Sequence, residues 1–192
     1  MSRLKKYKYE VMDLFCGIGG LSSGLKSRGF SVLAGYDLDQ TCRYAYETNN
    51  EAVFNYRDIK SVTGQEIAEQ YGKKSVKVLV GCAPCQPFSS YAFKNKKKDP
   101  NKYDLLYEFG RLIREVRPDI VAMENVTQIL RFEEKPVLND FLALLEELDY
   151  QYDVQQIYCP DYGIPQTRKR LVVVASRFGN IRLISPTHNK EN

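Results

Sequence analysis

The chain has 192 residues, of which 28 are basic and 24 acidic, so its formal net charge is +4. A hydrophobic content of 43% and a charged content of 27% are typical of a globular protein, and no apolar stretch approaches the ~20 residues that a transmembrane helix requires. The length fits one domain, and at this size about 70% of the unfolded surface can be buried without disulfide bonds.

Two residue counts limit the chemistry. The only histidine is His188, close to the C-terminal end, which excludes a Ser-His-Asp or Cys-His pair inside the fold and the HExxH zinc motif. Five cysteines, an odd count in a sequence that begins without a signal-peptide pattern, favour thiols in a cytoplasmic protein over a disulfide framework. Any chemistry must therefore use cysteine, carboxylates, Arg or Lys side chains, the backbone or a cofactor.

Apolar, β-rich runs alternate with amphipathic helical patterns along the chain. The predicted strands are, in order, residues 10–15, 31–36, 53–56, 76–81, 119–123, 152–158 and 171–175. The predicted helices are residues 21–27, 40–48, 64–71, 104–116 and 136–148. This alternation predicts an α/β fold with a parallel sheet and helices on both faces. No helical pattern separates the last two strands, which predicts an antiparallel pair at one edge.

In such sheets, ligands bind beyond the carboxyl ends of the strands. A short glycine-rich segment, residues 16–20, follows the first predicted strand, and glycine lets a backbone approach a ligand closely. The spacing is not GxGxxG, and a glycine turn alone is more often steric than functional. Asp37 ends the second strand about twenty residues later, and the two features together favour a nucleoside whose ribose hydroxyls bind the carboxylate. Asp39 is the better candidate for capping the next helix.

Cys82 and Cys85 form a CxxC pair with three interpretations. A zinc site lacks ligands, because only Cys159 is available and no suitable histidine exists. A thioredoxin-like redox pair is expected to run into a helix, which Pro87 and the polar loop after it oppose. The third interpretation makes Cys85 a nucleophile on a stiff Pro84–Pro87 elbow, as a thiolate favoured by nearby cations.

Three charged side chains are further candidates for chemistry. Glu124 ends the fifth predicted strand, where a carboxylate is rarely present for packing and can act as an acid or base. Arg168 and Arg170 enter the last strand with a spacing of two, so both face the same side. Surface solvation is one interpretation of the two arginines, and binding of a base carbonyl, carboxylate or phosphate is the other.

The segment between residues 94 and 102 is rich in lysine. It contains five lysines and one acidic residue, Asp99. A solvated charge run and a lid that contacts phosphates both remain open for this segment.

Together these motifs resemble those of the cytosine-5 DNA methyltransferases, in family order and along nearly the whole chain. The matching segments are DLFCGIGG (residues 13–20), GCAPCQPFS (81–89), ENV (124–126) and QTRKR (166–170). One such motif is suggestive, whereas four in order are highly specific.

The resemblance implies a Rossmann-like S-adenosylmethionine-dependent methyltransferase fold of about seven strands, mostly parallel, with an antiparallel edge hairpin. It places S-adenosylmethionine across the carboxyl ends of the first strands, with Phe15 near the adenine and Asp37 at the ribose. Asp58 and Ile59 are expected at the adenine, and no metal is implied. The full set of expected cofactor contacts is Phe15, Gly17, Ile18, Gly19, Gly20, Asp37, Leu38, Asp58, Ile59, Pro84 and Leu105.

For catalysis, the resemblance implies that a cytosine is flipped out of double-stranded DNA. Cys85 adds to its C6 atom while Glu124 hydrogen-bonds N3; C5 takes the methyl group, and loss of the C5 proton expels Cys85. Arg168 is expected at the base carbonyl, with Arg170 supporting it. The expected nucleic-acid contacts are Gln86, Ser89, Lys94, Lys96, Lys97 and Lys98.

Members of this family usually continue, after a segment like residues 185–188, into a target-recognition region and a C-terminal segment with a Gly-Asn motif. We therefore expect residues 1–192 to be a single catalytic domain whose missing parts come from a companion chain, with a truncated protein as the alternative. The local pair Gly179-Asn180 is expected to be a hairpin turn. A thiol–disulfide protein using Cys82 and Cys85, a non-catalytic nucleic-acid-binding module and an RNA cytosine methyltransferase remain alternative functions.

Overall fold

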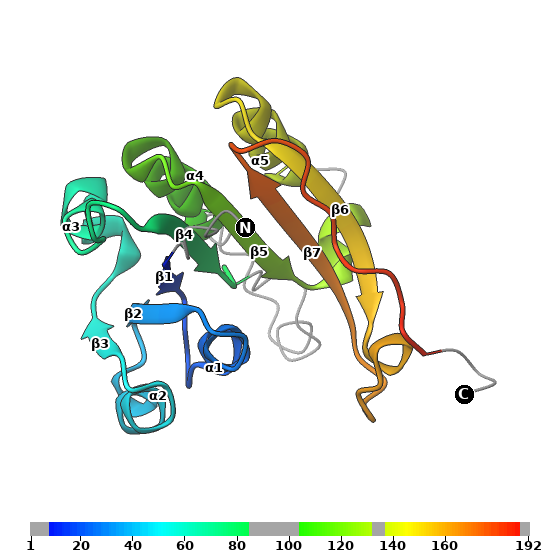
Figure 1. Cartoon of the computed structure of the whole chain (residues 1–192), viewed down its shortest axis with the longest axis horizontal. Coiled ribbons are helices and arrows are strands. Elements are labelled where there is room, and N and C mark those ends of the chain that lie inside the picture. The colour runs from blue at the N-terminus through cyan, green and yellow to red at the C-terminus, as the bar shows by residue number, and fades with distance from the viewer. Residues whose placement is uncertain (1–7, 85–103, 132–136, 189–192) are drawn as a thin grey trace, which may run out of the picture. The chain divides into compact units, whose positions relative to one another are not determined.

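The computed structural model describes residues 8–84, 104–131 and 137–188 (Figure 1). Seven strands follow the order β3-β2-β1-β4-β5-β7-β6, which confirms the predicted α/β architecture. The chain divides into two compact units, one of residues 1–81 with 111–121 and the other of residues 82–110 with 122–192.

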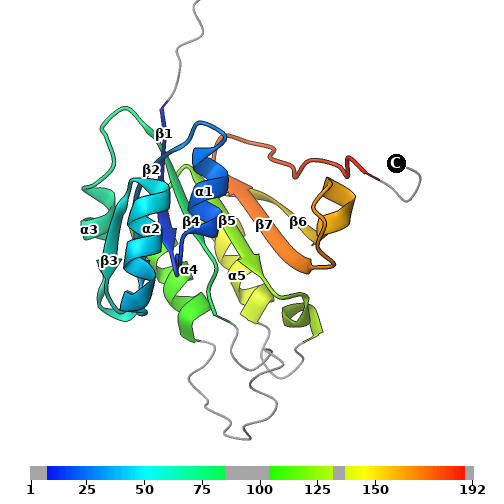
Figure 2. The same ribbon diagram turned by 90° about the horizontal axis from the view of Figure 1, so that it is seen from below.

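The first unit contains four parallel strands in the order β3-β2-β1-β4. They are β1 (Tyr9–Leu14), β2 (Ser31–Asp37), β3 (Val53–Tyr56) and β4 (Val76–Gly81). The connecting helices are α1 (Gly20–Lys26), α2 (Arg43–Asn50) and α3 (Gly64–Ala68). Figures 1 and 2 show α1 and α2 on one face of these strands and α3 on the other. Every residue of β1 after Tyr9 is buried, as expected for a central parallel strand covered on both faces.

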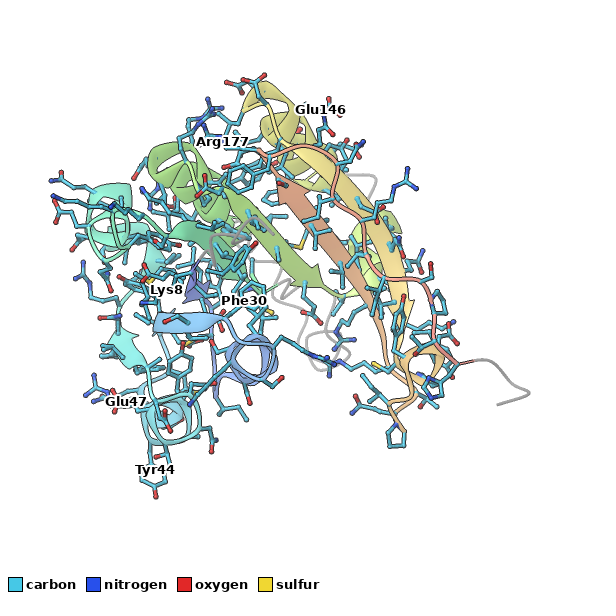
Figure 3. All side chains as sticks on the ribbon, in the orientation of Figure 1. Lys8, Phe30, Tyr44, Glu47, Glu146 and Arg177 are labelled. Carbon is cyan, nitrogen blue, oxygen red and sulfur yellow. The ribbon has the colours of Figure 1, made fainter. Side chains whose placement is uncertain are left out.

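Helix α2 separates its aromatic residues between solvent and core. Tyr44 points away from the helix (Figure 3) and is 81% exposed, whereas Tyr46 is completely buried. The ring of Tyr46 packs edge-on against Phe54, with 5.8 Å between ring centroids. A β-carbon at Gly35 would lie 2.5 Å from the Tyr46 ring, so glycine in β2 makes room for this packing.

The second unit contains the antiparallel pair. Its strands include β6 (Gln151–Tyr158) and β7 (Lys169–Ser176), which run side by side in opposite directions (Figure 1). This pairing confirms the prediction for the last two strands. β5 (Ile120–Asn125) ends in this unit, and α5 (Val137–Glu147) packs Phe141 against Phe109 of α4 (Asp104–Val116), with ring centroids 5.7 Å apart.

Short 3-10 helices occupy several connections between the strands and helices. They are η1 (Gln40–Cys42), η2 (Ile59–Ser61), η6 (Thr127–Arg131) and η7 (Cys159–Tyr162). The predicted helix 40–48 therefore begins as η1, and the predicted helix 64–71 is shorter and ends at Ala68.

The hairpin predicted at Gly179-Asn180 is wrong. Gly179 lies in a bend after β7, and residues 180–188 form no strand. Their backbone donors bind elsewhere: Leu183 N–H donates to Asp153 Oδ2 at 2.9 Å, and His188 N–H donates to the Asp161 carbonyl at 3.0 Å. Within the described ranges, no helix is both long enough and apolar enough to cross a membrane.

Candidate active site

The turn between β1 and α1 is closed on one side and open on the other. A β-carbon at Gly19 would lie 2.1 Å from Asn50 Nδ2 and 2.7 Å from the Tyr46 ring, and the φ of Gly19 is +86°, so only glycine fits there. At Gly17 and Gly20, no atom of the described residues lies within 4 Å of such a β-carbon. The turn therefore rests on α2 through Gly19 and presents a bare backbone at Gly17 and Gly20.

Gly19→Ala is expected to destabilise the fold by at least about 2 kcal/mol, because the methyl group collides with α2 and the positive φ is strained. The matched control is Gly24→Ala inside α1, where no described atom lies within 4 Å of the added carbon. That variant is expected to stabilise the protein by about 0.5–1 kcal/mol, since alanine favours helix. Urea unfolding measures both changes, and equal effects in the two variants would contradict this packing.

The Asp37 carboxylate accepts hydrogen bonds from two backbone segments, the β1–α1 turn and the segment that follows β2. Its Oδ2 accepts the Gly17 N–H at 2.8 Å, and its Oδ1 accepts the Asp39 N–H at 2.9 Å. Asp39 in turn accepts the Thr41 N–H at 3.0 Å and caps η1, which confirms the capping role predicted for it. A carboxylate oxygen has two lone pairs, so Asp37 retains acceptor capacity for a hydroxyl ligand. Its contact with a ribose stays a prediction.

The predicted apolar contacts differ in exposure. Ile18 and Leu38 are 64% and 62% exposed, and Phe15 is half-buried with a φ of +58°. Ile59 is only 5% exposed, so its side chain belongs to the core. Asp58 is exposed, and its Oδ1 accepts the Lys60 N–H at 3.0 Å.

A buried polar chain lies beneath the glycine turn. The Ser22 hydroxyl donates to Asp13 Oδ2 at 2.6 Å, and the Tyr46 hydroxyl lies 3.0 Å from the same Ser22 oxygen. Asp13 has no exposed surface, and burial raises the pKa of its carboxyl to about 7, with the nearby Asp37 charge adding to the shift. Sequence reasoning missed this network, although an aspartate within the apolar run of β1 was a signal.

The Asp13 carboxyl gives folding a specific pH dependence. Its pKa is about 7 in the folded protein against 3.8 for the ordinary group, so ionisation opposes folding as pH rises from about 4 to 7 and costs a constant amount above that. Asparagine does not ionise, so Asp13→Asn removes this cost. The unfolding free energy of Asp13→Asn minus that of the unsubstituted protein is expected to rise by about 4 kcal/mol between pH 4 and pH 8. Urea unfolding across this range measures the difference, and a pH-independent difference would contradict the assignment.

In the second unit, an acid and two arginines meet where β5 ends and β7 begins. Arg170 Nε lies 2.6 Å from Glu124 Oε1, and Arg168 Nη2 lies 3.8 Å from the same oxygen. The Glu124 side chain is 28% exposed, and that of Arg168 is 47% exposed. The structure therefore brings together three of the four predicted catalytic residues and leaves Arg168 the more accessible arginine.

Asn125 forms a hydrogen bond to the segment that follows β4. Its buried Nδ2 donates to the Ala83 carbonyl at 3.2 Å, and its Oδ1 accepts the Val126 N–H at 2.7 Å. Pro84 is exposed, Leu105 is half-buried in α4, and Cys82 is present as a thiol. Among the described residues, no group of His, Cys, Asp and Glu is placed to hold a metal ion.

Seven of the predicted site residues lie outside the described residues. They are Cys85, Gln86, Ser89, Lys94, Lys96, Lys97 and Lys98.

Comparison with known proteins decides the family. Residues 9–192 match the family described as C-5 cytosine-specific DNA methylase. The chain belongs to this family. It is 50% identical over 182 residues to the Type II methylase M.HgiDII of Herpetosiphon aurantiacus, covering 95% of this chain and 51% of that protein. It is 29% identical to the Type II methyltransferase M.AquIA of a Picosynechococcus strain, covering 95% of this chain and 78% of that protein.

The fold of this cytosine-5 methylase chain also matches solved structures. The crystal structure of DNMT2 from Spodoptera frugiperda superimposes with a TM-score of 0.71 at 25% identity, covering 88% of this chain and 50% of that one. The predicted family and the Rossmann-like methyltransferase fold are both confirmed. S-Adenosylmethionine is the methyl donor of such enzymes in general. The chain spans about half the length of the curated relatives that it matches most strongly.

Proposed function

We propose that this chain is the catalytic part of an enzyme that methylates C5 of cytosine in double-stranded DNA. The observation that carries the proposal is the convergence of Arg168 and Arg170 on one oxygen of Glu124, in a chain of this family. Both ion pairs use Oε1, so the second oxygen, Oε2, is the one that we assign to a nucleobase.

The β1–α1 turn and the end of β2 fit S-adenosylmethionine. The bare backbone at Gly17 and Gly20 suits the methionine part, Asp37 has acceptor capacity for the ribose, and the exposed Leu38 and Ile18 suit an aromatic ring. When bound there, S-adenosylmethionine supplies an electrophilic methyl group. The protein's part is to hold the donor and to make C5 of the cytosine nucleophilic.

The cytosine must leave the duplex, because its C6 edge cannot be reached inside the base stack. We propose that the Cys85 thiolate forms a bond to C6 while Glu124 Oε2 is hydrogen-bonded at N3, which moves the electron pair of the C5–C6 double bond onto C5. C5 then forms the bond to the methyl group as the bond between that methyl group and the donor sulfur breaks, so the electron pair of the broken bond would leave with S-adenosylhomocysteine. A base removes the C5 proton, the double bond re-forms, and the Cys85–C6 bond breaks to return the thiolate.

We assign different roles to the two arginines beside Glu124. Arg170, 2.6 Å from Glu124, fixes the orientation of the carboxylate, and the more exposed Arg168 is assigned to the base carbonyl. Six polar side chains are assigned to DNA contacts. Four of them are lysines, which can pair with phosphates: Lys94, Lys96, Lys97 and Lys98. The other two are Gln86 and Ser89.

We propose that target recognition and the segment that completes the cofactor pocket come from outside residues 1–192, either on a continuation of the same chain or on a companion chain. This chain covers 51% of M.HgiDII, so about half of that relative has no counterpart in residues 1–192. Base-edge contacts that define the DNA sequence would then lie mainly outside these residues.

The test is transfer of labelled methyl groups from S-adenosylmethionine to nucleic acid by the complete enzyme that contains this chain. Labelling of cytosine C5 in double-stranded DNA is expected. Labelling of tRNA without DNA would overturn the DNA substrate, and binding of S-adenosylmethionine without any transfer would identify a non-catalytic module instead.

A further inference from the structure

Two side chains of α4 bind the loop that follows β3. Arg111 and Glu115 are one helical turn apart and form an ion pair, with 2.9 Å between Arg111 Nη1 and Glu115 Oε1. Arg111 Nη2 also donates to the carbonyls of Ile59 at 3.1 Å and Val62 at 3.0 Å. Glu115 Oε2 accepts the N–H of Gly64 at 2.6 Å. The pair therefore holds residues 59–64 at three points, all within the first unit.

These contacts are close and partly shielded from water. The side chains of Arg111 and Glu115 are 31% and 38% exposed. Burial raises the pKa of the Glu115 carboxyl, but hydrogen bonds from Arg111 and from the Gly64 backbone outweigh it and hold that pKa below its ordinary value. A β-carbon at Gly64 would lie 2.2 Å from Glu115 Cβ, so the start of α3 lies directly against α4.

The loop held in this way carries Asp58 and Ile59. Its other hydrogen bonds are mostly local, such as Ser61 N–H to the Asp58 carbonyl at 2.9 Å and Val62 N–H to the Ile59 carbonyl at 3.2 Å. At its start, the Arg57 N–H donates to the Asp37 carbonyl at 3.1 Å, so the loop begins beside the end of β2. Local bonds shape η2, while the bonds from α4 fix where η2 lies in the unit.

We propose that Arg111 and Glu115 are positioning residues for the cofactor site, which hold residues 59–64 so that Asp58 and the backbone of Ile59 stay at the position expected for the adenine. This inference rests on the proposed function. Neither side chain touches the cofactor in this role. Their effect is on the affinity for S-adenosylmethionine, because the loop must be ordered before it can bind, and a loop that is already ordered loses less entropy on binding.

The test replaces Arg111 by methionine in the complete enzyme. Arg111→Met is expected to raise the Kd and the KM for S-adenosylmethionine by about ten-fold, the size expected when a charge-assisted hydrogen bond is lost. The kcat at saturating S-adenosylmethionine and the KM for DNA are expected to stay unchanged. A role in stability alone would lower the active fraction, and hence kcat, at an unchanged KM.

Arg57→Met is the matched control. Arg57 Nη2 donates to the Ser61 carbonyl of the same loop at 3.2 Å, but its side chain is 45% exposed and its ion pair with Glu66 is 3.5 Å long. Exposed pairs of this kind contribute little, so the Kd is expected to stay within about two-fold. If Arg57→Met weakened binding as much as Arg111→Met, the proposed positioning role would be overturned.

The remaining outcomes separate the two proposals. If the unsubstituted enzyme bound no S-adenosylmethionine, the proposed function would fail. If it bound normally and a folded Arg111→Met variant bound equally well, only the positioning role would fail. Should Arg111→Met not fold, Glu115→Gln serves instead: it keeps the shape and weakens the ion pair, and an unchanged Kd in that variant overturns the positioning role.

Discussion

Cys85→Ser is expected to lower kcat for DNA methylation by at least about 10⁴-fold, because the nucleophile of a covalent mechanism is removed. A serine hydroxyl is almost wholly protonated at neutral pH, whereas a cysteine thiol supplies reactive thiolate. The Kd for S-adenosylmethionine is expected to stay the same, since in the proposed mechanism Cys85 acts on the cytosine. Initial rates of labelled methyl transfer at saturating substrates measure the effect.

Cys82→Ser is the matched control, three residues away in the same CxxC pair. This near-isosteric change at a half-buried thiol is expected to leave kcat within about three-fold. Equal losses in the two variants, together with a measurable thiol–disulfide couple, would contradict the nucleophile assignment and favour the redox interpretation.

Glu124→Gln is expected to lower kcat by about 10²–10⁴-fold with an unchanged Kd for S-adenosylmethionine. The amide keeps the size of the side chain but cannot exchange a proton with N3 of the cytosine. It also loses the ion pair that Arg170 makes at 2.6 Å. Single-turnover rates of methyl transfer separate this chemical effect from product release.

Glu146→Gln on α5 is the control for Glu124. Glu146 is exposed and accepts a hydrogen bond from the Tyr152 hydroxyl at 2.7 Å, and Figure 3 shows it on the outer side of the molecule's second unit. Substitutions at such surface positions rarely change stability by more than about 0.5 kcal/mol, so normal rates are expected. A wild-type single-turnover rate in Glu124→Gln would contradict the role assigned to that carboxylate.

Sequence periodicity predicted the fold well because these strands and helices follow simple burial patterns. β1 is buried from Glu10 onward and is apolar there apart from Glu10 and Asp13, and α5 buries Val137, Leu138, Phe141 and Leu145 at helical spacing. The cap at Asp39 was also predicted, since an aspartate's hydrogen bond to a following N–H is a local interaction. The hairpin turn predicted from the local Gly179-Asn180 pair was wrong. The backbone N–H groups of later residues donate instead to a side chain and a carbonyl that are distant in the sequence.

The long-range contacts of the site were not predictable in the same way. Gly19 is required by Tyr46 and Asn50, which belong to another helix, and no local pattern connects them. Arg111 and Glu115 are recognisable from their spacing as an ion pair on a helix, but their partners at Ile59 and Gly64 are about 50 residues away in the chain. The motif resemblance named residues that are expected to contact ligands and left unnamed those whose contacts support the site.

The most direct measurement uses double-stranded DNA that carries 5-fluorocytosine at the target base, with the complete enzyme and S-adenosylmethionine. Fluorine at C5 cannot leave as a proton does, so the bond between enzyme and C6 cannot be released after methylation. Mass spectrometry of the digested complex is expected to find the methylated base attached to the peptide that contains Cys85, and to find none with Cys85→Ser. Methylation of ordinary cytosine without any trapped complex, or a complex at Cys82, would contradict the proposed mechanism.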